Sequence, residues 1–420
     1  MSLVVIGVNN RAMPLDLFER FSIGDDALPK ALFGVLSRRN ISEAVILSTC
    51  NRTEVYAYAE KFHGAYQDIR DFLAETAQIA PEDFSDHLYA HYEDEAIQHL
   101  FAVTCGLDSV IIGENEVQHQ VKVAWEHARE EGTCGSVING AFRRALEVGK
   151  RVRTQTDISK NTSSVARVCV EMAEDHLGNF VNRKVIVVGA GEVGQGVATA
   201  LKQSQVGHIS FVNRSFDRAA ELADMFEGDA IPFQELNETL VAADVLFAST
   251  AADLVLFDRL LLEQVMARRN GRDLLIVDIA VPRDVDPSVS SIEGITLFDI
   301  DSLWSYRAHN PLSGVTGERN EAQIIISEEV GRFLEQQSAR QVAPLIAGFR
   351  NGAEEIRLAE LKRFENRLAD LSDEQRDAVE SLTQGILGKI LHEPTVAMNE
   401  AAGSPRGDRL AEALRELFKI

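Results

Sequence analysis

The spacing of apolar residues divides the chain into three stretches of different texture. The first, up to about residue 157, mixes short apolar runs with amphipathic segments, which is typical of a small α/β domain. Strands are predicted at 2–8, 43–47 and 54–58, and helices at about 26–38, 65–77, 115–131 and 136–154, with a further helical pattern from about 94. The alternation over 54–58 makes it the expected hairpin partner of 43–47.

The middle stretch carries continuous apolar runs of the kind found in buried parallel strands. These runs cover 184–188, 208–212, 245–248 and 274–278. The residues after the last two runs, 249–250 and 280–283, fall at the carboxyl ends of the strands, where ligands bind in open α/β sheets. This pattern predicts a doubly wound, Rossmann-type domain.

The last stretch is polar and helical, and apolar residues recur in it every three or four positions. Its stripes are Ala322, Ile325, Ile326, Val330 and Phe333; Leu361, Phe364, Leu368 and Leu371; and Leu382, Ile386 and Ile390. Such stripes favour a dimer seam, with a bundle packed only against its own chain as the alternative. A loop is expected at 403–407, before a closing helix. The prediction is an α/β multidomain chain with domains at 1–157, 158–308 and 309–420, the last of them all-α.

Composition and charge narrow the class of protein. The chain has 420 residues, of which 45% are apolar and 25% charged, as in an ordinary soluble multidomain protein. Four scattered cysteines without a CxxC pair fit reduced thiols in the cytoplasm, and neither a signal peptide nor a membrane-spanning run is apparent. The net charge of −23 argues against nucleic acid as a partner of the whole surface, although the basic run at 143–153 is a candidate for phosphate contacts.

Cys50 follows a predicted buried strand and is expected in the turn at its end. A thiol held in such a turn can face a cleft, as a nucleophile must, and Arg52 lies close enough in sequence to lower its pKa or to bind a carboxylate. An ordinary packed thiol is the alternative interpretation.

A glycine-rich turn follows the apolar run at 184–188. It reads Gly189-Ala190-Gly191-Glu192-Val193-Gly194 and opens a helical stretch, which is the context that distinguishes a dinucleotide-binding turn from a chance match. The glycines permit close approach of the backbone, and the helix N-terminus receives the pyrophosphate.

The residues after the next strand suggest which dinucleotide is bound. An NAD enzyme places an acidic residue there, whereas this chain has Asn213, Arg214 and Ser215, with Arg218 a helical turn later. An arginine and small hydrogen-bonding groups suit a 2′-phosphate, so the sequence favours NADP(H).

Taken together, these motifs resemble those of glutamyl-tRNA reductases, and the resemblance runs nearly end to end. Its most specific pieces are the segments 48–54 (Ser-Thr-Cys-Asn-Arg-Thr-Glu), 99–101 (His-Leu-Phe), 106–109 (Gly-Leu-Asp-Ser), 113–114, 120–122, 150–153 and 277–284 (Val-Asp-Ile-Ala-Val-Pro-Arg-Asp). The family implies a homodimer of an N-terminal catalytic domain, an NADPH domain, and a long spinal helix leading to a dimerisation domain.

The resemblance also implies an activity and a set of site residues. The expected reaction is NADPH-dependent reduction of glutamyl-tRNA(Glu) to glutamate-1-semialdehyde through a Cys50 thioester, with His99 as the second catalytic residue and glutamate-1-semialdehyde aminomutase as a possible partner. The expected substrate-binding residues are Thr49, Asn51, Arg52, Ser109, Glu114, Asn115, Glu116 and Gln120.

Three departures from the family pattern occur, at Asn10, at Cys105 and in the segment 113–122. This segment reads Gly-Glu-Asn-Glu-Val-Gln-His-Gln-Val-Lys, with His119 in place of a glycine, where the family usually has Gly-Glu-Pro-Gln-Ile-Leu-Gly-Gln-Val-Lys. Asn10 stands where a histidine is usual, and Cys105 where a small residue is usual. Glu116 replaces a glutamine and adds negative charge beside an anionic substrate, which should weaken glutamyl binding unless another group compensates.

Two further functions are compatible with parts of the sequence. A small-molecule NADP oxidoreductase of the shikimate-dehydrogenase type also carries Asn-Arg after its second strand, but it needs no thiol nucleophile. A non-catalytic paralogue that binds tRNA or a pathway partner is suggested by the departures at Glu116 and His119.

Overall fold

The computed structural model describes residues 2–59, 61–109, 111–114, 116–156, 158, 164–250, 252, 254–309 and 315–419. The chain forms two compact units, Met1–Ile326 and Ser327–Ile420. The strands are β1 (Ser2–Asn9), β2 (Ile41–Ser48), β3 (Arg52–Ala59), β4 (Tyr89–Tyr92), β5 (Lys184–Val188), β6 (His208–Val212), β7 (Asp229–Ile231), β8 (Val245–Ala248), β9 (Leu274–Asp278) and β10 (Ile295–Phe298). The helices are α1 (Leu15–Phe18), α2 (Leu28–Leu36), α3 (Phe62–Ala77), α4 (Asp94–Thr104), α5 (Glu116–Glu130), α6 (Ser136–Gln155), α7 (Val165–Leu177), α8 (Glu192–Gln203), α9 (Phe216–Phe226), α10 (Leu236–Ala242), α11 (Arg259–Arg268), α12 (Ile300–His309), α13 (Val315–Arg363), α14 (Asp373–Ala401) and α15 (Pro405–Phe418).

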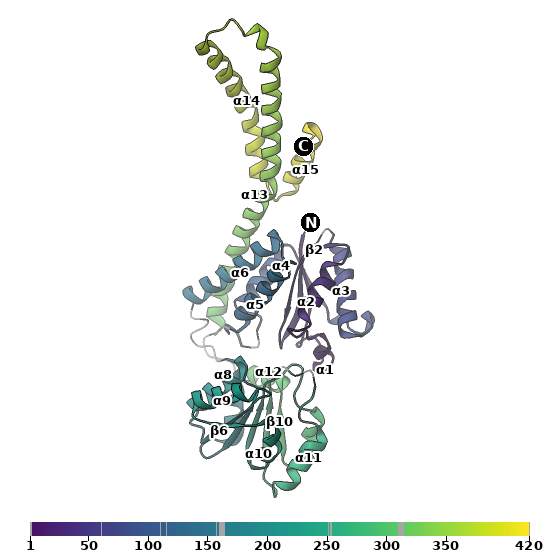
Figure 1. Ribbon diagram of the computed structural model, residues 1–420, viewed down its shortest axis with the longest axis vertical. Coiled ribbons are helices and arrows are strands. Elements are labelled where there is room, and N and C mark those ends of the chain that lie inside the picture. Colours follow the sequence, from purple (N-terminus) through teal and green to yellow (C-terminus); the bar gives the residue numbers. More distant parts are fainter. Residues whose placement is uncertain are drawn as a thin grey trace. The chain divides into compact units, whose positions relative to one another are not determined.

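The N-terminal part of the first unit is built on a four-stranded sheet in the order β2-β3-β1-β4. All its pairings are antiparallel, and β2 and β3 form the predicted hairpin, with Ser48 opposite Thr53 next to the turn. Helices α4, α5 and α6 lie on one side of this sheet and α3 on the other (Figure 1). The short strand β4 was not predicted, because it has only four residues (Tyr-Ala-His-Tyr) and none of them is buried.

The cofactor-type domain is a six-stranded parallel sheet in the order β10-β9-β8-β5-β6-β7. Successive residues of each strand point to opposite faces, so Val185 and Val187 pack with α7, α8 and α9, whereas Ile186 and Val188 pack with α10 and α11. The four predicted strands have the predicted bounds. The predicted doubly wound α/β class is confirmed.

The C-terminal unit is helical, as predicted. Its core joins α13, α14 and α15 through Val342, Leu345, Phe349, Leu391, Met398 and Leu414. The stripe predicted across residues 361–371 is wrong as a single helix face, because α13 ends at Arg363. The chain turns before α14, where Ser372 and Gln375 form a capping box that fixes the new N-terminus.

The last helix also begins earlier than predicted. Ser404 caps α15 by accepting a hydrogen bond from the Gly407 amide (3.1 Å), and Pro405 occupies the first helical position. The expected loop at 403–407 therefore ends at Ser404. Among all the helices described above, none is both long and apolar enough to cross a membrane.

Candidate functional site

Cys50 lies in the turn between β2 and β3, at the place the sequence predicts. The Thr49 hydroxyl oxygen accepts hydrogen bonds from the backbone N–H groups of Asn51 (3.1 Å) and Arg52 (3.2 Å), which holds the turn closed. Asn10, which directly follows β1, reaches the same turn and donates to the Asn51 side-chain oxygen (3.1 Å). Its own side-chain oxygen is buried and has no hydrogen-bond partner among the described residues. The half-buried thiol is thus presented by a rigid turn.

The surroundings of Cys50 raise the pKa of its thiol, whereas the sequence suggested that Arg52 could lower it. Burial raises the pKa of Cys50, and the carboxylates of Glu116 and Glu114 raise it further. Arg52 acts in the opposite direction, but its effect on the pKa of Cys50 is the smaller one. Activation of the thiol by Arg52 alone is therefore not supported. Glu116, the residue that departs from the family pattern, is the charged group that acts most strongly against the thiolate.

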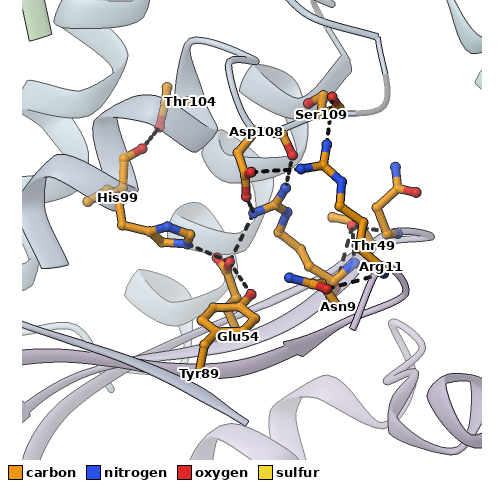
Figure 2. Close-up of polar contacts among 12 residues, drawn as sticks. Asn9, Arg11, Thr49, Glu54, Tyr89, His99, Thr104, Asp108 and Ser109 are labelled. Carbon is orange, nitrogen blue, oxygen red and sulfur yellow. Dashed lines mark hydrogen bonds and ion pairs between the residues drawn. The ribbon is translucent and has the colours of Figure 1, made fainter. Parts of the chain in front are cut away.

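Glu54 is the centre of a buried polar cluster next to this turn (Figure 2). Its side chain is fully buried, and its carboxylate accepts hydrogen bonds from Arg52 Nη1 (3.0 Å), Tyr56 Oη (2.6 Å), Tyr89 Oη (2.6 Å) and His99 Nε2 (2.7 Å). We call these five residues the Glu54 network. Burial by itself would raise the pKa of Glu54, but His99 and Arg52 outweigh it and hold that pKa well below its usual range.

Arg52 is held by a second acidic residue as well. Its Nη1 lies 2.8 Å from Asp108 Oδ2, and its Nη2 donates to the Asp108 backbone oxygen (2.5 Å). Arg11 approaches from the other side, donating to Asp108 Oδ1 (3.2 Å) and to the Ser109 backbone oxygen (3.1 Å). Two guanidinium groups therefore flank Asp108, and the expected carboxylate-binding arginine is already neutralised by Glu54 and Asp108.

The remaining predicted substrate-binding residues cluster where α5 begins. Burial raises the pKa of Glu114 to about 7, although a hydrogen bond from Ser109 acts against this. Burial also raises the pKa of Glu116, with a smaller contribution from Glu192, and Gln120 donates a hydrogen bond to Glu116 (3.4 Å). Asn115 and the expected domain boundary at 157 lie outside the described residues.

The glycine-rich turn has the shape that a pyrophosphate requires. Gly189 has φ +107°, and a Cβ there would lie 2.5 Å from the Ser249 backbone oxygen. A Cβ at Gly194 would lie 2.1 Å from the Gly189 oxygen, whereas one at Gly191 would point into open space. The first turn of α8 has no side-chain cap, which leaves its backbone N–H groups available to a ligand phosphate. The turn therefore fits a dinucleotide, as predicted for Gly189, Ala190, Gly191, Glu192, Val193 and Gly194.

The end of β6 supplies the other predicted cofactor residues. Asn213 donates to the Ser215 backbone oxygen (3.0 Å) and so shapes the turn into α9. Arg214 is exposed and makes no hydrogen bond or ion pair with any residue in the described ranges. An unpaired cation at this position suits a ligand phosphate.

The site contains residues that the sequence argument did not single out. Glu54 and Asp108 lie within the motifs quoted above, and Tyr56 lies in the predicted strand 54–58, but none of them received a role, and Tyr89 was not identified. A signal was present, since Arg52, Glu54 and Tyr56 alternate along β3 and must share one face of the sheet. The sequence carried no such signal for Tyr89, because β4 is too short to be recognised as a strand. No group of three or more potential metal-ligating side chains occurs in the parts of the chain described here.

These features define a class of protein, an oxidoreductase that combines a thiol-bearing α/β domain with a dinucleotide-binding domain. Three protein-family models match the chain. The model of the glutamyl-tRNA(Glu) reductase N-terminal domain matches residues 6–156, and the model of shikimate/quinate 5-dehydrogenase matches residues 171–305. The model of the glutamyl-tRNA(Glu) reductase dimerisation domain matches residues 321–420.

Full-length relatives agree with these matches. The chain is 38% identical to the glutamyl-tRNA reductase of Desulforudis audaxviator and 36% identical to that of Geobacter metallireducens, covering 100% of this chain and 94% and 96% of theirs. The solved glutamyl-tRNA reductase of Methanopyrus kandleri superposes with a TM-score of 0.52 at 31% identity, covering 100% of this chain and 99% of that one. The chain belongs to the glutamyl-tRNA reductase family.

Proposed function

We propose that this protein reduces glutamyl-tRNA(Glu) to glutamate-1-semialdehyde with NADPH through a thioester on Cys50, the first step of the C5 route to 5-aminolevulinate and tetrapyrroles. The observation that carries the proposal is the placing of Cys50 in a rigid turn beside the Glu54 network, in a chain that also holds a dinucleotide cradle. We take the thiol domain as 1–157, the cofactor domain as 158–308 and the dimerisation domain as 309–420.

The first half of the proposed reaction is acyl transfer. The Cys50 sulfur forms a bond to the glutamyl carbonyl carbon, the bond from that carbon to the tRNA ribose oxygen breaks, and the thiol proton ends on the ribose hydroxyl. Because the pKa of Cys50 is raised, a group must accept this proton during the attack. Glu114, whose pKa is about 7, and His99 are the candidates.

The second half reduces the thioester. NADPH, when bound, supplies the hydride that this step requires. The carbonyl carbon accepts the hydride, its oxygen takes a proton, and loss of the Cys50 sulfur from that carbon releases the aldehyde and regenerates the thiol. Gly189, Gly191 and Gly194 would hold the pyrophosphate, and Asn213, Arg214 and Ser215 the 2′-phosphate.

Recognition of the glutamyl group would use the charges around Asp108. Arg52 and Arg11 bring two positive charges to Asp108, and because Glu54 and Asp108 balance these charges, a substrate carboxylate would displace Asp108 from one of the guanidinium groups. The side-chain carboxylate of the substrate would lie there, and the carboxylates of Glu114 and Glu116 would face its ammonium group. Thr49, Asn51, Ser109, Asn115 and Gln120 would complete the pocket.

We further propose a homodimer formed through the C-terminal helices. On α14, Leu382, Ile386 and Ile390 repeat every four residues and are 63%, 51% and 64% exposed. Such a stripe matches the face that a second copy of the same helix would cover.

A partner enzyme and a location complete the proposal. A reactive aldehyde product favours direct transfer to glutamate-1-semialdehyde aminomutase. Because reduced thiols such as Cys50 persist in the cytoplasm, we place the enzyme there.

The decisive experiment incubates the purified protein with radiolabelled glutamyl-tRNA(Glu), with and without NADPH. Wild type should carry label as a thioester without NADPH and release labelled semialdehyde with it. Cys50→Ser should do neither, while Cys134→Ser, at the other half-buried cysteine, should behave as wild type. Absence of the thioester on wild type would contradict the proposal and favour a non-catalytic binding protein.

A further inference from the structure

An ion pair connects the cofactor domain to the segment that supports the Cys50 turn, within the unit Met1–Ile326. Arg283 Nε and Nη2 lie 2.8 and 2.9 Å from the two carboxylate oxygens of Glu19, and the Arg283 backbone N–H donates to the same carboxylate (2.8 Å). The two side chains are 17% and 16% exposed. Two parallel charge-assisted bonds fix orientation as well as distance.

The arginine stands on a rigid part of the cofactor domain. It follows β9 in the turn at the carboxyl edge of the sheet, the edge where a dinucleotide binds. The buried carboxylate of Asp278 accepts hydrogen bonds from the Ala280 (3.1 Å) and Val285 (2.9 Å) amides and so joins both arms of this turn. Asp284, also buried, accepts a hydrogen bond from the Thr250 amide (2.8 Å), at the end of the neighbouring strand β8.

The glutamate stands on a segment that is fastened to both sides of the thiol turn. Glu19 begins the short helix η1 (Glu19–Phe21). The Phe21 backbone oxygen accepts a hydrogen bond from Thr53 Oγ1 (3.0 Å), and the Ile23 amide donates to Ser48 Oγ (3.0 Å). Ser48 ends β2 and Thr53 lies in β3, so these two bonds enclose the turn that carries the thiol.

We propose that the Glu19–Arg283 pair is a positioning latch that aligns the ligand edge of the cofactor domain with the Cys50 turn. This inference rests on the proposed function, because a thioester in one domain must meet a hydride donor bound to the other. Acyl transfer to Cys50 uses only the thiol domain and does not need the alignment. Hydride transfer does need it, because a displacement of about 1 Å can slow a reaction about 100-fold.

The test separates the two half-reactions in the full-length protein. Glu19→Gln keeps the shape of the side chain but removes its charge, and Arg283→Gln removes the partner. We expect both variants to form the Cys50 thioester from glutamyl-tRNA(Glu) at the wild-type rate, and Glu19→Gln to bind NADPH with wild-type affinity. Reduction of the accumulated thioester in a single turnover should fall about 10- to 100-fold.

Two controls show that the effect comes from this contact. The exchanged double variant Glu19→Arg with Arg283→Glu should recover part of the reduction rate, because it restores opposite charges. Arg259→Gln removes an exposed arginine that pairs with Glu263 within α11 and donates hydrogen bonds to Ser288 and Ser291 of the same domain, and this variant should reduce the thioester as wild type does. Hydrogen exchange gives a readout without catalysis, since Glu19→Gln weakens the bond from the Arg283 amide and should raise its exchange rate.

The possible outcomes separate the latch from the proposed function. Wild-type reduction rates in Glu19→Gln and Arg283→Gln, or an equal loss of thioester formation and reduction, would overturn the latch while leaving the proposed function standing. A wild-type protein that never forms a thioester would instead contradict the proposed function itself.

Discussion

Replacement of Glu54 by glutamine tests the part of the site on which the other polar groups depend. The change keeps the size of the side chain but removes the charge that Arg52 and His99 face. It also puts an N–H₂ group in place of an oxygen that accepts hydrogen bonds, since Oε1 accepts from Arg52, Tyr89 and His99 and Oε2 accepts from Tyr56. Removing one partner of a buried ion pair costs about 3–5 kcal/mol. Because Arg52 keeps Asp108 as a partner at 2.8 Å, we expect Glu54→Gln to lower the free energy of unfolding by about 3 kcal/mol, the lower end of this range.

The assay is urea denaturation of the full-length protein, combined with hydrogen exchange at the amides of β3. The matched control is Glu75→Gln, whose side chain is 67% exposed and paired with Arg38; it should cost less than about 1 kcal/mol. The pKa of Glu54 is held low in the folded protein, so its stabilisation is present above the unfolded-state pKa of about 4.3 and is lost as pH falls below it.

The difference in unfolding free energy between wild type and Glu54→Gln should therefore be largest near about pH 7 and smaller at about pH 3. A cost no larger than that of Glu75→Gln would refute the view that this carboxylate organises the site. A cost that stays constant between these pH values would refute the charge-based explanation and leave only packing.

Four further substitutions test the thiol, the cofactor cradle, the contact with a 2′-phosphate and the dimer. Glu116→Gln removes the carboxylate that most opposes the Cys50 thiolate; the pKa of Cys50 should fall and iodoacetamide should alkylate it faster at about pH 8, whereas an unchanged rate would contradict this. Gly194→Ala forces a Cβ to 2.1 Å from a backbone oxygen, so NADPH affinity, measured by fluorescence titration, should fall at least about tenfold; wild-type affinity would argue against the cradle. Arg214→Gln should weaken NADPH binding but leave NADH binding unchanged, and equal losses would exclude a 2′-phosphate contact. Ile386→Glu should shift the protein to monomer in sedimentation velocity, and a persistent dimer would place the seam elsewhere.

Local chemistry explains which parts of the site the sequence could predict. The turn at Cys50 follows from an apolar run that ends in polar residues, and the cradle follows from a strand, three glycines and a helix in direct succession. Both are short-range features, so neighbouring residues suffice to define them. The end of α13 at Arg363 was missed because apolar spacing continues through the turn, and the capping residues at Ser372 decide where the next helix starts.

By itself, the sequence determined the three-domain class, the parallel strands, the thiol turn and the dinucleotide cradle, because each follows from periodicity or from adjacent residues. Only the tertiary structure decided the charges around the thiol. It brought His99 from α4 and Tyr89 from β4 onto Glu54, and it set Glu116 against Cys50. A pKa depends on burial and on charges across space, which spacing along the chain does not reveal. For the same reason, the pairing of Glu19 with Arg283 was visible only in the folded chain.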